Sequence, residues 1–449
     1  MEQTAKLNTF GRAQRKPVTR KERWAWYFYD FGNSAYAAVV LLAVYSAYFK
    51  QQVVGGAEGS RLWGFSIGIA MLVVAILSPV LGALADFSGT KKRLLSIFTV
   101  MAVGFTAMLF FVEKGDIWMG MVFFILAEIG YRGGQVFYNA LLPDIAAPEE
   151  MGRISGNGWA FGSLGGIVCL LVVLALITFV KGTFVIRLSF LITALFYALS
   201  TLPLFMFVKQ RRPPQTLPAH ESYITVSFKQ LYQTWKEASN YRQFLLFIVA
   251  FLIANNGIMM TMDFAGIIGA VLFNMTQTQL IVFMIIVQIT SVAGAFVFGK
   301  LVDRVSTKRA LILAILGMIL ACSLIFGAKS LLVFNLVGAL AGFALTGVQS
   351  VSRTAVGQLA PEEKSAQFFG IYSLASQISS FTGPALYGLL ATAFALSRER
   401  RGWEPLLAEQ TGMRLAVIAM VAFLAVGLVV LLFVRNWHKT QKPALEKAG

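Results

Sequence analysis

The sequence predicts an all-α integral membrane protein with twelve transmembrane helices in two parallel six-helix halves. Three observations support this fold class. Mean hydropathy is +0.71, and 13% of the 449 residues are charged, against about a quarter in soluble domains. Apolar runs long enough to cross a bilayer recur along the whole chain. A short loop with one residue pattern occurs once in each half.

The N-terminal region predicts a basic tail followed by a retained helix. Residues 1–23 are rich in Lys and Arg. The apolar run Trp26–Phe49 can span a hydrocarbon core of about 30 Å at about 1.5 Å per residue. It is too long for a signal-peptide core and has no convincing cleavage site. We therefore expect it to be the first transmembrane helix.

Eleven further spans complete the two halves, residues 24–208 and 243–434. A linker (residues 209–242) joins the halves, and a short tail (435–449) follows. The expected spans are Trp63–Ala85, Leu94–Val112, Ile117–Leu142, Gly156–Val180, Ile186–Val208, Phe244–Ala265, Leu280–Val302, Ala310–Gly327, Leu331–Gln358, Phe368–Leu396 and Met413–Val434.

The net charge of +17 is explained by topology rather than by a nucleic-acid partner. Most of the 38 Lys and Arg residues fall on one side of the spans, as the positive-inside rule expects. Both termini are therefore expected in the cytoplasm, with the protein in the plasma membrane, the inner membrane if the source is bacterial. Cys169 and Cys322 lie inside apolar runs of different halves and indicate neither a disulfide framework nor a metal site.

The repeated loop lies between the second and third spans and again between the eighth and ninth. Residues 82–93 read Gly-Ala-Leu-Ala-Asp-Phe-Ser-Gly-Thr-Lys-Lys-Arg, and residues 299–309 read Gly-Lys-Leu-Val-Asp-Arg-Val-Ser-Thr-Lys-Arg. We expect the first glycine to let two helices approach closely, and the loops to act as conformational latches. The candidate gating residues are Gly82, Asp86, Gly89, Lys91, Lys92 and Arg93, and Gly299, Asp303, Arg304, Lys308 and Arg309.

Further repeats support two homologous halves. Ala-Pro-Glu-Glu occurs at residues 147–150 and again at 360–363. Small residues recur every fourth position after each copy, a spacing that lets helices pack closely in lipid. They are Gly158, Gly162 and Gly166 in the fifth span and Ala375, Ser379 and Gly383 in the eleventh.

The repeated loops resemble the signature loop of the major facilitator superfamily of transporters. Phe87 stands where the family commonly has arginine, and Ser306 replaces the second glycine of the second copy. Residues 26–36, 139–146 and 155–158 are similar to one branch of that superfamily, the autophagy-linked vacuolar amino-acid effluxers and their bacterial relatives. The resemblance implies a substrate path between the halves at mid-membrane.

The linker contains a second expected helix. Phe228, Leu231, Tyr232 and Trp235 recur at helical spacing with Lys229 and Lys236 between them. This pattern fits an amphipathic helix on the inner leaflet, and equally a solvated helix packed on the bundle.

Charged residues inside the spans mark the candidate site, because a central charge costs about 2.5–3.5 kcal/mol in lipid. Glu128 and Arg132 are i, i+4 neighbours, and Asp30 is expected at nearly the depth of Arg132. We therefore predict an acidic–basic–acidic cluster, with a static ion pair as the alternative. Asp30 is the candidate proton carrier, since a carboxylate without its partner in a low-dielectric cavity favours its neutral form.

Polar residues of both halves extend this site. Asn255 and Asn256 are placed near the middle of the seventh span, as substrate ligands or as interhelical hydrogen bonds. Asp263 is placed nearer the outer end, and Arg353 at the inner end of the tenth span, where it is expected to snorkel. The remaining candidate residues are Asn33, Tyr36, Gln135, Asn139, Gln349 and Gln377.

These features favour a secondary transporter over an enzyme. The only histidines, His220 and His438, fall outside the spans, and no catalytic or cofactor-binding constellation is visible in the sequence. We expect a monomer in the lipid bilayer that moves a small polar metabolite, an amino acid by family resemblance. Efflux is the expected direction, with protons a candidate coupling ion. The alternatives are multidrug efflux and a non-transporting membrane receptor or scaffold.

Overall fold

The computed structural model describes residues 18–146, 150–180, 182–211, 217, 222–328, 330–360 and 365–435. Most of the basic tail, most of both Ala-Pro-Glu-Glu motifs, both histidines and the tail after Arg435 lie outside this part. The side chains of Asp86, Leu231 and Asp303 also lie outside it.

The described elements of the N-terminal half are all helices, joined by short loops. Its first span is divided by two π-helical segments. The elements are α2 (Arg20–Tyr36), η1 (Ala37–Ala43), α3 (Tyr45–Tyr48), η2 (Phe49–Val54), α4 (Gly56–Phe87), α5 (Lys91–Met108), η3 (Leu109–Phe111), α6 (Ile117–Ala140), α7 (Leu142–Ile145), α8 (Met151–Phe179) and α9 (Thr183–Phe207).

The linker forms one helix, and six long helices make the C-terminal half. The elements are α10 (Tyr223–Ala238), α11 (Arg242–Leu272), α12 (Gln277–Val305), α13 (Thr307–Gly327), α14 (Leu331–Leu359), α15 (Ser365–Glu399) and α16 (Pro405–Leu432).

The twelve expected spans correspond to twelve helical segments. Eleven are long and apolar enough to cross a membrane. The twelfth, α6, has 24 residues but carries Glu128 and Arg132, which lower its hydropathy. Helices α4 and α16 begin about two turns before their expected spans, in more polar sequence, and α11 continues about two turns past Ala265 in a stretch that is itself apolar. The first span differs most from the expected regular α-helix, because its two π-helical segments cannot be predicted from composition.

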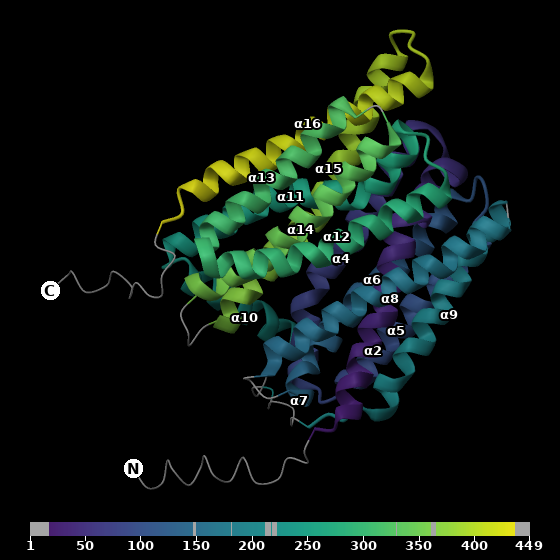
Figure 1. Ribbon diagram of the computed structural model, residues 1–449. Coiled ribbons are helices and arrows are strands. Elements are labelled where there is room, and N and C mark those ends of the chain that lie inside the picture. Colours follow the sequence, from purple (N-terminus) through teal and green to yellow (C-terminus); the bar gives the residue numbers. More distant parts are fainter. Residues whose placement is uncertain are drawn as a thin grey trace, which may run out of the picture.

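Both halves lie side by side, with the start of α2 and the end of α16 on the same side of the bundle as α7 and α10 (Figure 1). We call this side the tail face and the opposite side the far face. The helix α10 lies across the tail-face ends of α4 and α15, so it contacts both halves.

The two halves contact each other mainly toward the far face. A Cβ on Gly64 of α4 would lie 2.5 Å from the Pro384 carbonyl of α15. Thr392 Oγ1 donates to Ala57 O at 2.9 Å. Closer to the tail face, Ser78 Oγ donates to Gln377 Oε1 at 3.0 Å. The bundle is therefore closed at the far face.

The expected stripes of small residues do pack closely. A Cβ on Gly158 of α8 would lie 2.5 Å from the Trp26 ring of α2, and one on Gly162 would lie 2.5 Å from Asp30 Oδ2. In the other half, Ser379 of α15 donates to Leu252 O of α11 at 3.0 Å. Small side chains thus allow the close packing that was expected, and the structure shows its partners to be α2 with α8 and α11 with α15.

Candidate functional site

The predicted charge pair on α6 is present. Arg132 Nε donates to Glu128 Oε1 at 2.8 Å, and the Glu128 side chain is 0% exposed while that of Arg132 is 32% exposed. The terminal nitrogens of Arg132 donate to no acceptor among the described residues. Glu128 therefore orients the guanidinium and leaves its outer edge free for an anion.

Two tyrosines pack beside the Glu128–Arg132 ion pair. The rings of Tyr36 and Tyr131 lie 4.8 Å apart, and Tyr36 interacts electrostatically with Glu128. Within the described chain, the Tyr36 hydroxyl and Glu128 Oε2 are buried without a hydrogen-bond partner. Tyr36 is the last residue of α2 before the π-helical segment η1, a feature frequent at functional sites.

The predicted three-residue cluster is wrong in one member, because Asp30 does not pair with Arg132. Asp30 lies against Gly162 of α8 and interacts with the Asn33 side chain. It has no ion pair in the part of the chain that is described. Asn33 is buried, and its Oδ1 accepts from Tyr197 at 3.0 Å. The helix turns Asp30 toward α8, while Tyr36, six residues later, faces α6.

Polar residues on α6 continue from Arg132 toward the tail face. Gly130 packs on α5, where a Cβ would lie 2.5 Å from Ala102 N. Gln135 and Asn139 follow Arg132 at i+3 and i+7, so their side chains lie on the same side of α6 as Arg132, half-buried and exposed, respectively. On α14, Gln349 is half-buried and Arg353 is exposed, and Arg353 interacts with Tyr372.

The predicted asparagines of α11 have different roles. Asn256 Nδ2 donates to Leu252 O at 2.8 Å, and its Oδ1 accepts from Thr382 at 2.6 Å, so it joins α11 to α15. Asn255 is fully buried, and neither side-chain polar atom has a partner in the described residues. Gln377 makes the contact with Ser78 across the halves.

Asp263 was not among the predicted site residues, although it is a lone acid in a span. The seventh span was expected to end at Ala265, but α11 continues to Leu272, so Asp263 lies deeper than expected. It interacts electrostatically with Arg132 and Glu128 of the other half. The high cost of placing a charge in lipid could have marked Asp263 as a candidate site residue from the sequence.

The repeated loops anchor helix ends within their own halves. Lys92 Nζ donates to Phe205 O and Val208 O, both at 2.8 Å, and so caps the end of α9. Lys308 Nζ donates to Leu432 O at 2.8 Å and Val434 O at 2.7 Å at the end of α16. These symmetric caps place a positive charge at the negative end of each helix. The neighbouring Arg93, Arg304 and Arg309 are exposed.

The expectation that the first loop glycine allows close helix approach is wrong for this conformation. A Cβ on Gly82 or Gly299 would meet no atom within 4 Å. Both glycines lie toward the tail face, beyond the contacts between the halves described above. Gly89, by contrast, does require glycine, because its φ is +66°.

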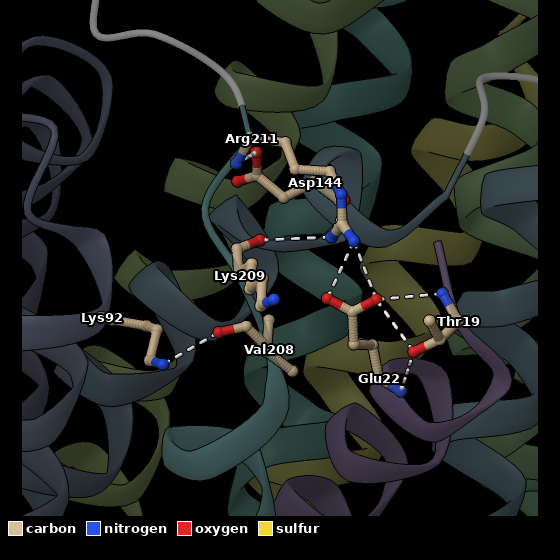
Figure 2. Close-up of polar contacts among 7 residues, drawn as sticks. All are labelled: Thr19, Glu22, Lys92, Asp144, Val208, Lys209 and Arg211. Carbon is tan, nitrogen blue, oxygen red and sulfur yellow. Dashed lines mark hydrogen bonds and ion pairs between the residues drawn. The ribbon is translucent and has the colours of Figure 1, made fainter. Parts of the chain in front are cut away.

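A second polar cluster holds the start of the linker to the N-terminal half (Figure 2). Arg211 Nη2 donates to both carboxylate oxygens of Glu22, at 2.9 and 2.8 Å, and Arg211 N donates to Asp144 Oδ1 at 2.8 Å. Lys91 Nζ lies 3.6 Å from Asp144 Oδ2 and donates to Ala140 O at 3.2 Å. These contacts hold Arg211 at the start of the linker to the N-terminal half.

This architecture defines a multi-pass membrane transporter. No group of metal-ligating side chains occurs among the described residues. The fold matches a bacterial homologue of the human lysosomal transporter Spinster, with a TM-score of 0.70, 15% identity and coverage of 92% and 95% of the two chains. It also matches a mutant of the nucleoside transporter NupG, with a TM-score of 0.71, 13% identity and coverage of 91% and 99%.

The chain belongs to the family described as vacuole effluxer Atg22 like, which matches residues 62–442. The uncharacterised MFS-type transporter YxiO of Bacillus subtilis is 27% identical over 430 residues, covering 93% of this chain and 96% of YxiO. Autophagy-related protein 22 of Yarrowia lipolytica is 24% identical, with coverage of 73% and 70%. The resemblance to the major facilitator superfamily and this branch is thereby confirmed.

Proposed function

We propose that this protein exports a small polar metabolite bearing a carboxylate, an amino acid in the first instance, by alternating access of its two halves. The observation that carries this proposal is the state of Arg132. Glu128 engages its Nε, while the terminal nitrogens have no protein acceptor in the described structure. A guanidinium oriented in this way suits bidentate binding of a carboxylate.

The direction of transport is inferred from family and topology. The family description names effluxers. The positive-inside rule favours a cytoplasmic tail face, at a plasma membrane or bacterial inner membrane. Because contacts between the halves lie toward the far face, substrate would enter this state from the cytoplasm.

Asp30 is the proposed proton carrier. It is half-buried, has no ion pair among the described side chains, and lies one helix turn from the tail-face end of the first expected span. Uptake and release of a proton there would link transport to a pH gradient.

Counterflow into proteoliposomes tests the transport proposal. Vesicles with purified protein are loaded with amino acids, peptides, sugars or nucleosides, and exchange of the labelled compound is measured. We expect exchange with amino acids, strongly reduced by Arg132→Gln. The exposed Arg401→Gln is the matched control and should leave exchange unchanged. Exchange only of large apolar compounds would instead indicate multidrug efflux.

A further inference from the structure

Asp263 is a buried acid whose carboxylate makes no hydrogen bond or ion pair with the described residues. The residue is only 6% exposed. Its backbone oxygen accepts from Trp63 Nε1 of the other half at 3.0 Å. A buried carboxylate without compensation is costly, so its presence calls for a ligand.

The surrounding contacts place Asp263 beside the charge pair of the N-terminal half. The Trp63 ring that binds the Asp263 carbonyl packs on Phe124 of α6, with ring centres 4.5 Å apart. Phe124 is four residues from Glu128 and therefore next to it on the same helix face. The electrostatic interaction of Asp263 with Arg132 and Glu128 agrees with this placement.

The local charge balance favours a cation as the missing ligand. Two carboxylates, Glu128 and Asp263, surround one guanidinium, Arg132. Glu128 is the acid paired directly with Arg132, so Asp263 has no counter-ion in direct contact among the described residues.

We propose that Asp263 binds the ammonium group of a substrate whose carboxylate is bound by Arg132. This inference rests on the proposed function and narrows its substrate class to zwitterions. The two charges of one small molecule would then be held by opposite halves. Binding would favour the state in which the halves approach, because only that state satisfies both ends of the ligand.

Thermal unfolding of the purified full chain in detergent tests this assignment. Three probe mixtures are titrated: the common L-amino acids, short-chain monocarboxylates from propionate to hexanoate, and the corresponding primary amines. The variants are Asp263→Asn and Asp263→Glu, with the exposed Glu404→Gln as control. Of the three mixtures, we expect the amino acids to raise the unfolding temperature of the parent and of the control variant most.

For Asp263→Asn we expect apparent affinity for the amino acids to fall about 10- to 100-fold, the loss typical of a charged hydrogen bond. Asp263→Glu should retain part of the affinity. Without ligand, Asp263→Asn should unfold at or above the parent temperature, because an unpaired buried charge has been removed. A clearly lower temperature would show a structural partner and overturn the assignment.

The remaining outcomes separate the two proposals. Parent-like affinity of Asp263→Asn for the amino acids overturns the role of Asp263. If the parent binds the monocarboxylates but not the amino acids, the zwitterion inference fails while a carboxylate transporter stands. If the parent binds none of the three mixtures, the proposed function fails and this inference fails with it.

Discussion

Lys50 and Glu409 form an ion pair that joins the two halves at the far face. Lys50 Nζ lies 2.5 Å from Glu409 Oε1, and the side chains are only 5% and 7% exposed. Lys50 belongs to η2 at the end of the first span, and Glu409 to the first turns of α16. Opening of the far face in the proposed alternating-access cycle would separate these elements and break this pair.

Glu409→Gln should destabilise the far-face-closed state. It leaves the Lys50 charge buried without its partner, and breaking a buried pair in this way costs about 3–5 kcal/mol. Labelling of a cysteine at Ala57, which is buried at the far-face contact, should therefore become faster. Glu404→Gln serves as the control. Labelling at the parent rate in Glu409→Gln would show that the pair does not hold this face closed.

The Glu128–Arg132 pair should behave as a coupled unit. Arg132→Gln leaves Glu128 buried and unpaired, so we expect a loss of about 3–5 kcal/mol in the free energy of unfolding. The double variant Glu128→Gln/Arg132→Gln should lose less than the sum of the single variants. Thermal unfolding in one detergent measures all three. If the losses of the single variants simply add in the double variant, Glu128 and Arg132 do not stabilise the protein through their interaction.

Asp30→Asn should abolish accumulation driven by a pH gradient while counterflow persists, because exchange requires no net proton movement. Proteoliposomes with an imposed gradient measure the first property, and exchange at equal pH measures the second. Asp116→Asn, an acid at the start of α6, is the control. The coupling role of Asp30 is lost if Asp30→Asn accumulates substrate as the parent does.

Ser306→Gly should stabilise the protein. Ser306 has φ +122° and ψ 153°, a conformation suited to glycine that costs other residues about 1–3 kcal/mol. Its side chain caps α13 by accepting from Arg309 N at 3.4 Å, and replacing such a cap by glycine costs only a few tenths of a kcal/mol.

Two companion variants test this strain. Ser306→Ala keeps the strained backbone and removes the cap, so it should destabilise by about 0.5–2 kcal/mol. Gly89→Ser places a side chain at φ +66° in the first loop and should cost about 1–2 kcal/mol. If Ser306→Gly unfolds at a lower temperature than the parent, the strain is absent.

The linker helix α10 should lie in the membrane interface. Val226 and Ala238 pack on the bundle, while Ile224, Phe228, Tyr232 and Trp235 form an exposed apolar stripe. Thr225, Lys229 and Lys236 occupy a third face. A polarity-sensitive fluorophore on Phe228→Cys should therefore emit at shorter wavelength in liposomes than one on Thr225→Cys. Equal emission from both would indicate a solvated linker helix instead.

Much of the fold could be predicted because lipid imposes a strong rule on composition. The expected spans correspond to twelve helical segments, since each must satisfy its backbone hydrogen bonds while crossing an apolar layer. Helix ends differ by up to two turns at α4, α11 and α16. Polar residues begin α4 and α16 before the apolar run, whereas at α11 the apolar run itself continues to Leu272. The Glu128–Arg132 pair was also predictable, because i, i+4 neighbours meet on any helix.

Relationships between helices required the tertiary structure. Sequence determines depth along a span but not the direction in which each side chain points. Asp30 was therefore expected beside Arg132 but faces Gly162 of α8. Asp263 was placed near an outer end but interacts with Arg132, and Lys50 pairs with a glutamate 359 positions away. From the sequence one could predict two homologous six-helix halves with charges in their spans. Helix rotation and packing decided which charges meet, because small residues such as Gly130 and Gly162 set which faces touch.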